Sequence, residues 1–196
     1  MKYLFLEFFA LLSTMVLVVL SIYIDVAILG NRIPEVSVTE FTQSAVILLT
    51  IVLFLAKIKK EPESAGLFVL ISGLFTMIFV READYYLDFI YHGLWKVPVF
   101  IIFCATIYFA YKHNDTIIKP LISYQNSKAF TYAIIGLLIT IVFSRLFGTR
   151  SLWGLIMEDA DHTKTLVQEG LESLGYSLIL MGAFIAHFNK KQQVKA

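Results

Sequence analysis

The chain has 196 residues, of which 58% are hydrophobic and 16% are charged. Soluble domains are about 45–50% apolar and about 25% charged, so this is the composition of a membrane protein. The net charge of +1 lacks the basic excess that nucleic-acid binding requires, and the single cysteine, Cys104, excludes an internal disulfide.

Hydropathy predicts an all-α, polytopic protein that forms a single transmembrane domain, 1–196, with six spans and with the lipid bilayer as its partner. Lys2 precedes the first apolar run as in a signal peptide, but the run is too long and has no small-x-small cleavage site, so we expect a retained helix. The expected spans are Leu4–Leu29, Phe41–Ala56, Ala65–Val80, Val97–Tyr111, Ala129–Phe147 and Leu166–Phe188.

The basic residues predict a cell-membrane protein with both termini in the cytoplasm, because cytoplasmic segments are enriched in lysine and arginine. In this orientation the inner side carries ten of them: Lys2, Lys57, Lys59, Lys60, Lys112, Lys119, Lys128, Lys190, Lys191 and Lys195. The outer side carries six: Arg32, Arg81, Lys96, Arg145, Arg150 and Lys164.

Most of the acids gather at the outer side in this orientation. Acids barely influence topology, so their distribution needs another cause, and it indicates that the polar chemistry lies at the outer end of the helices. The outer acids are Asp25, Glu35, Glu40, Glu82, Asp84, Asp88, Glu158, Asp159, Asp161, Glu169 and Glu172.

Two local echoes suggest three parallel helical-hairpin repeats, 1–64, 65–128 and 129–196. "TMIFVR" at Thr76–Arg81 matches "TIVFSR" at Thr140–Arg145, where two helices end. "TEFTQS" at Thr39–Ser44 echoes "QEGLES" at Gln168–Ser173, where two helices begin. Short matches in apolar sequence also arise by chance, so coincidence stays open as the alternative.

The third span has only 16 apolar residues, about 24 Å at 1.5 Å per residue, which is shorter than the roughly 30 Å hydrocarbon core. We therefore expect its helix to continue past Arg81 and Asp84 towards Tyr91. On that helix Arg81 can pair with Asp84, and Asp88 with His92 at i and i+4 can bind a metal ion.

A second polar set begins the sixth span. Glu169 and Glu172 share one helix face, and the helix dipole favours carboxylates in this place. His162 in the preceding loop and Glu40 on the second span are further candidates. Carboxylates with imidazole suit zinc, manganese or iron, so the expected metal ligands are Asp88, His92, Glu169, Glu172, His162 and Glu40.

Three functions are compatible with these residues. The first is a metal-dependent hydrolase for a lipid or lipid-linked substrate at the outer leaflet, with Asp84 as base and Arg81 or Arg145 stabilising an anionic intermediate. The second is a cation or proton transporter or channel, although the span centres lack ionisable groups. The third is a non-catalytic subunit or sensor, in an oligomer or complex, whose outer charges contact a partner. Helix capping and ion pairing at a wet membrane edge is the alternative that needs no site.

Overall fold

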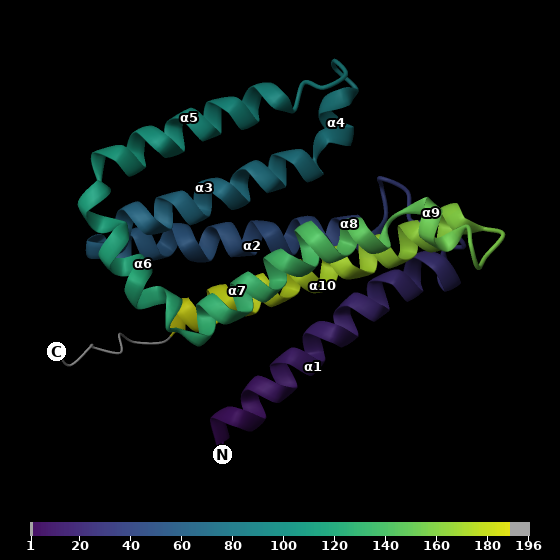
Figure 1. Ribbon diagram of the computed structural model, residues 1–196, viewed down its shortest axis with the longest axis horizontal. Coiled ribbons are helices and arrows are strands. Elements are labelled where there is room, and N and C mark those ends of the chain that lie inside the picture. The colour runs from purple at the N-terminus through teal and green to yellow at the C-terminus, as the bar shows by residue number, and fades with distance from the viewer. Residues whose placement is uncertain (1, 189–196) are drawn as a thin grey trace. The chain divides into compact units, whose positions relative to one another are not determined.

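The computed structural model describes residues 2–188, and the part of the chain that it describes is helical without strands (Figure 1). Lys190, Lys191 and Lys195, which contribute to the predicted orientation, lie outside the described residues. The chain folds as two compact units. Unit 1 comprises Met1–Gln43 and Tyr132–Met181, and unit 2 comprises Ser44–Thr131 and Gly182–Ala196.

Within residues 2–188, five helical segments are long and apolar enough to cross a membrane, as expected of a membrane protein. They are Phe5–Ile28, Val38–Lys60, Pro62–Glu82, Lys128–Phe147 and Ala160–Phe188. The predicted fourth span forms helix α5, Lys96–Lys112, whose 17 residues extend about 26 Å. The six spans, the hairpin repeats and the orientation of the termini stay predictions.

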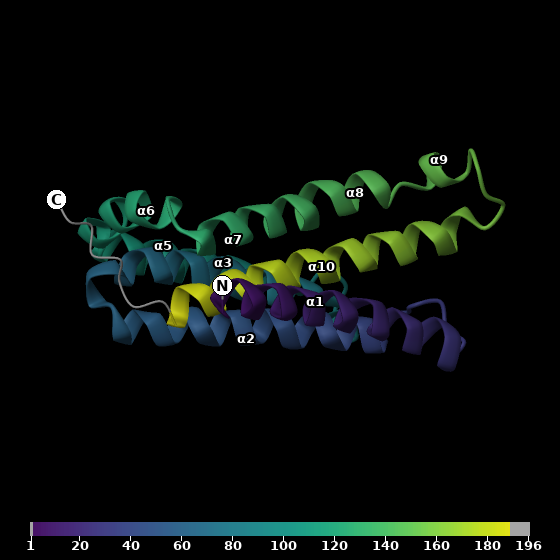
Figure 2. The same ribbon diagram turned by 90° about the horizontal axis from the view of Figure 1, so that it is seen from below.

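Unit 1 contains α1 (Lys2–Tyr23), the start of α2 (Val38–Lys60), most of α7 (Lys128–Leu138), α8 (Ser144–Phe147), α9 (Arg150–Trp153) and α10 (Ala160–Phe188) up to Met181. A π-helical turn, η1 (Ile24–Ile28), extends α1, and a second, η4 (Ile139–Phe143), joins α7 to α8 in one continuous rod (Figure 2).

Unit 1 holds its helices together by close backbone approach. A Cβ on Gly136 would lie 2.5 Å from the backbone oxygen of Gly175, so α7 and α10 meet where neither has a side chain. Small residues allow such contact between membrane helices. Ile179 on the same face of α10 is 1% exposed, and α1 touches α10 through Ile22 and Gly170.

Unit 2 contains the rest of α2, two 3₁₀ turns, η2 (Pro62–Ser64) and η3 (Asn114–Thr116), and the helices α3 (Ala65–Glu82), α4 (Asp84–Asp88), α5 and α6 (Ile118–Gln125). Helices α3 and α5 lie side by side (Figure 1). Phe54 of α2 is 1% exposed and stacks with Phe68 and Phe75 of α3 at 6.1 and 6.3 Å between ring centroids. These stacked rings form the aromatic core of unit 2.

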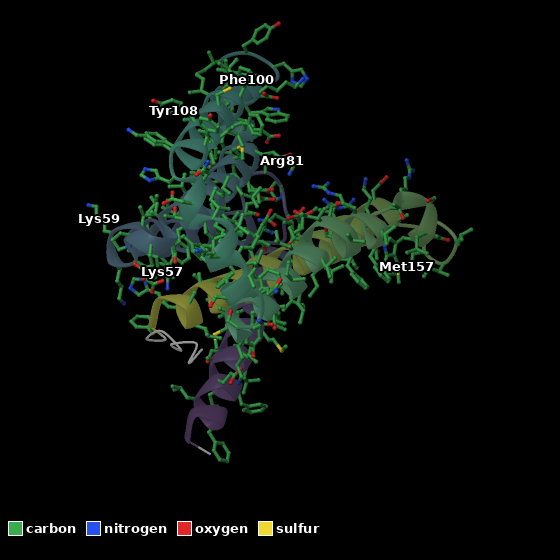
Figure 3. The ribbon with its side chains drawn as sticks, turned by 60° about the vertical axis from the view of Figure 1, so that its left-hand side comes forward. Lys57, Lys59, Arg81, Phe100, Tyr108 and Met157 are labelled. Carbon is green, nitrogen blue, oxygen red and sulfur yellow. The ribbon has the colours of Figure 1, made fainter. Side chains whose placement is uncertain are left out.

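The predicted continuous helix from the third span to Tyr91 is wrong. Helix α3 ends at Glu82, Ala83 leaves the helical region at φ −90° and ψ 14°, and the short α4 follows. A turn with Gly93 at φ +80° then leads to α5. Arg81 lies at the end of α3, and Phe100 and Tyr108 are 66% and 63% exposed on α5 (Figure 3).

Candidate functional site: the polar interior of unit 1

The candidate residues fall in both units. Unit 1 contains Glu40, Arg145, His162, Glu169 and Glu172, and unit 2 contains Arg81, Asp84, Asp88 and His92. Each group is described within its own unit, and the meeting of all nine in one site stays a prediction.

The first polar feature of unit 1 is Asp25, which is fully buried in η1. Its Oδ1 accepts hydrogen bonds from the Val38 backbone N–H at 3.0 Å and the Asn31 amide at 3.2 Å. Its Oδ2 accepts from the Thr39 backbone N–H at 2.8 Å and the Thr39 hydroxyl at 2.7 Å. Asp25 therefore satisfies the otherwise unpaired N–H groups at the start of α2.

Ser37 completes this helix start, because its hydroxyl accepts the Glu40 N–H at 3.2 Å. Ser37 and Glu40 match the Ser-x-x-Glu capping box, which places the predicted metal ligand Glu40 in the third position of α2. The pattern was present in the sequence, so a structural role for Glu40 could have been read from it.

One turn further along α2, Gln43 reaches α10. Its Nε2 donates to Glu169 Oε2 at 3.0 Å, to the Glu169 backbone oxygen at 3.2 Å and to Ser173 Oγ at 3.0 Å. Gln43 is 1% exposed, and its Oε1 is buried without a hydrogen-bond partner. The three acceptors around Nε2 establish this orientation of the amide, since the reversed amide would turn its oxygen towards a carboxylate and a carbonyl.

Glu172 lies on the side of α10 that meets α7 and α8. It is 3% exposed, and its Oε1 accepts from Gln168 Nε2 at 3.2 Å and lies 3.6 Å from Arg145 Nη2. The Arg145 side chain is 51% exposed, so the guanidinium neutralises a buried acid while keeping donors at the surface. We call Gln43, Arg145, Gln168, Glu169, Glu172 and Ser173 the α10 polar cluster.

Hydroxyl groups continue the polar interior beyond the acids. Ser144 is fully buried and its hydroxyl donates to the Thr140 backbone oxygen, while Ser177 on α10 is 2% exposed. Thr140 Oγ1 is buried without a hydrogen-bond partner, and a Cβ on Gly175 would lie 2.0 Å from it. Thr140 sits in the π turn η4, and such turns are frequent at functional sites.

In unit 2 Asp88 and His92 bond directly to each other, and their binding of a metal ion stays a prediction. His92 Nδ1 lies 2.9 Å from Asp88 Oδ2, and Asp88 Oδ1 accepts the Gly93 N–H at 2.8 Å. The His92 side chain is 97% exposed, so its Nε2 faces solvent. A histidine that bonds a carboxylate through one nitrogen is oriented to bind a metal through the other.

The predicted ion pair of Arg81 with Asp84 is wrong. Arg81 Nη1 instead lies 3.0 Å from Glu82 Oε1. The helix break at Ala83 lies between Arg81 and Asp84, so the two residues no longer occupy successive turns of one helix.

The remaining candidate, His162, lies in the first turn of α10. Its backbone N–H approaches Asp159 Oδ1 at 3.4 Å, and its buried Nδ1 has no hydrogen-bond partner. Exposed ion pairs surround this end of unit 1, with Arg32 on Asp159 and Arg150 on Asp161. Exposed pairs of this kind contribute little to stability.

Within residues 2–188 the structure brings together no group of three or more His, Cys, Asp or Glu side chains with metal-binding geometry. The predicted zinc, manganese or iron ion therefore stays a prediction. Comparisons with protein-family models, with curated proteins and with solved structures found no match for this chain.

Proposed function

We propose that this chain is a membrane protein that binds a cation through the α10 polar cluster, at the outer side of the membrane. The single observation that carries the proposal is the buried, unpartnered Oε1 of Gln43. This acceptor belongs to the same buried side chain whose nitrogen contacts the Glu169 carboxylate and the Ser173 hydroxyl. A buried acceptor without a donor is unfavourable by about 1–3 kcal/mol, and a cation would remove that penalty.

The chemistry of these ligands narrows the choice of ion. Carboxylate, amide carbonyl and hydroxyl are all oxygen donors, which suit magnesium, calcium and manganese. Of the predicted ions zinc, manganese and iron, this cluster therefore favours manganese. In the apolar interior of a membrane, ionisable side chains are expensive to retain and mark functional sites by default.

The reaction class that we propose is hydrolysis of a lipid or lipid-linked substrate at the outer leaflet. A bound divalent cation supplies activation of water at neutral pH. Arg145 is held by Glu172 but half-exposed, so its remaining N–H groups can bind the anionic headgroup of a substrate. Glu172 would position the guanidinium for that contact.

Cation transport is the second candidate, and the buried hydroxyls of Thr140, Ser144 and Ser177 favour it. They extend the polar interior of unit 1 past the acids, and the free oxygen of Thr140 can coordinate a dehydrated ion.

Elemental analysis of the purified protein tests the first proposal. We expect stoichiometric divalent metal in the native protein and in the control Glu158→Gln, which alters an exposed loop acid. The variants Glu169→Gln and Gln43→Leu should lose the metal. Metal that survives in both variants and disappears in His92→Ala would contradict the proposal and move the site to the Asp88–His92 pair.

Protein without metal that conducts cations in liposomes would contradict hydrolysis and support transport. In that case Thr140→Val, which keeps the shape of the side chain and removes its oxygen, should reduce the flux.

A further inference from the structure

Helix α6 in unit 2 has three distinct sides. Ile118, Leu121 and Ile122 are 62%, 37% and 54% exposed and share one face at i, i+3 and i+4. Lys119 and Ser123 share a second, polar face. Pro120 and Tyr124 are half-buried on the third.

The third side packs against the rest of unit 2. The Tyr124 ring meets Phe130 edge-on at 5.8 Å between centroids, and the Tyr124 hydroxyl is buried. Upstream, the Gly66 N–H at the start of α3 donates to Thr116 Oγ1 at 2.8 Å, and a Cβ on Gly66 would lie 2.6 Å from the His113 backbone oxygen. The segment that leads into α6 is thereby fixed to α3, and the exposed apolar face is presented by a positioned helix.

Positive charge flanks the apolar face. Lys112 and Lys119 are exposed, and neither has an acidic partner within residues 2–188. Asp115 is the one acid of the described chain between them, so the segment remains net positive. Lysines beside an apolar helix face are attracted to anionic lipids, each by about 1 kcal/mol.

We propose that α6 lies in the membrane–water interface at its end of unit 2. Ile118, Leu121 and Ile122 insert among lipid chains, and Lys112 and Lys119 contact acidic phospholipid headgroups. A helix with an apolar face, a polar face and lysines at its edge fits the interfacial region and no other part of a bilayer. This lipid surface is independent of the α10 polar cluster.

Site-specific fluorescence of the full chain tests the proposal. In a Cys104→Ser background, Ile122→Cys and its neighbour Ser123→Cys are each labelled with a polarity-sensitive dye and placed in lipid nanodiscs. We expect blue-shifted emission at position 122, strong quenching by a nitroxide near the top of the lipid chains, and neither effect at position 123. Acidic nitroxide lipids should quench position 122 more than zwitterionic ones, and Lys119→Glu should remove the difference.

Equal emission at the two positions would overturn the proposal. So would a blue shift at position 122 that lipid nitroxides do not quench, because a second protein copy would then cover the face. Circular dichroism and size-exclusion chromatography of each labelled protein serve as folding controls: native helical content and a single elution peak show that neither result comes from misfolding.

Discussion

Asp25 combines burial with four hydrogen bonds and thereby ties the end of α1 to the start of α2. Both of its oxygens are used, and three of its partners belong to Val38 and Thr39. A carboxylate that caps a helix is stabilised by the positive end of the helix dipole as well as by the bonds. The structure therefore assigns Asp25 to stability.

Replacing Asp25 by alanine should lower the free energy of unfolding by about 2–4 kcal/mol, because the buried Thr39 hydroxyl and two N–H groups lose their acceptor. Unfolding of the purified protein by a denaturing detergent measures the change. Glu35→Ala, an exposed acid in the same loop, is the control and should change stability by less than about 0.5 kcal/mol. Equal stability of the two variants would contradict the capping role.

Lys57 has the corresponding role at the end of α10 in unit 2. It is 4% exposed, its Nζ lies 2.8 Å from Glu61 Oε1 and donates to the Ala186 backbone oxygen, and it faces the Phe68 ring at 5.0 Å. Lys57→Met should lower the free energy of unfolding by about 2 kcal/mol, because the Ala186 carbonyl and the Glu61 carboxylate lose their donor. Thermal unfolding should show this as a clearly lower melting temperature. Lys59→Met, at an exposed position of the same helix, should leave it unchanged.

At the scale of the elements, α7 and η4 contact α10 along a close seam that contains Gly136 and Gly175. Gly175 is its tightest point, with Thr140 Oγ1, the Gly136 oxygen and the Thr140 nitrogen 2.0, 2.7 and 3.0 Å from where a Cβ would stand. Two of these atoms belong to the backbone, so the neighbours cannot yield without moving a helix.

Gly175→Ala should therefore lower the free energy of unfolding by about 1–3 kcal/mol, even though alanine favours helices more than glycine does. Gly154→Ala, where a Cβ would lie 3.2 Å from the Arg150 oxygen and 4.0 Å from the Ala160 Cβ, should have a small effect. Chemical unfolding of both variants measures these changes. A stabilised Gly175→Ala protein would contradict the close approach of α7 and α10.

The positions of the helices could be predicted from sequence because long apolar runs must form hydrogen-bonded helices in lipid. The break at Ala83 and the two π turns were not predictable in this way. Ala83 is a good helix former with no local stop signal, and nothing in "IDVAI" or "ITIVF" distinguishes a π turn from an α turn. Such deviations depend on contacts with other helices.

The candidate site, like the fold, could be predicted from the sequence only in part. Asp88 and His92 were expected as metal ligands on one continuous helix; they bond to each other because they are near in sequence, although α4 ends at Asp88. The contacts of Gln43 with Glu169 and Ser173 span 126 and 130 residues, and those of Arg145 with Glu172 depend on the register of α8 on α10. Sequence periodicity gives the face of a helix but not its partner, so Gln168, Thr140 and the pairing of Arg145 went unrecognised.

At the scale of the whole molecule, α5 decides how many times the chain crosses the membrane. With 17 residues it is short, yet its exposed Phe100 and Tyr108 suit contact with lipid. In a Cys104→Ser background, an impermeant thiol reagent applied from outside should label Tyr91→Cys and leave Asn114→Cys unlabelled, because the predicted six spans put these exposed residues on opposite sides. Labelling of both from one side would show that α5 does not cross.

The π turn η4 accommodates one extra residue in the helix that runs from α7 to α8. Its bond from the Ser144 N–H to the Ile139 oxygen encloses one residue more than an α turn does. Removing a single residue there, such as the exposed Ile141, would leave an ordinary α turn, and the side chains before and after it would keep nearly the same directions, with Arg145 still against Glu172. The same deletion in the α-helical part of α7 would instead rotate all later side chains by about 100°, turn Arg145 away from Glu172 and leave the buried acid without its counter-charge.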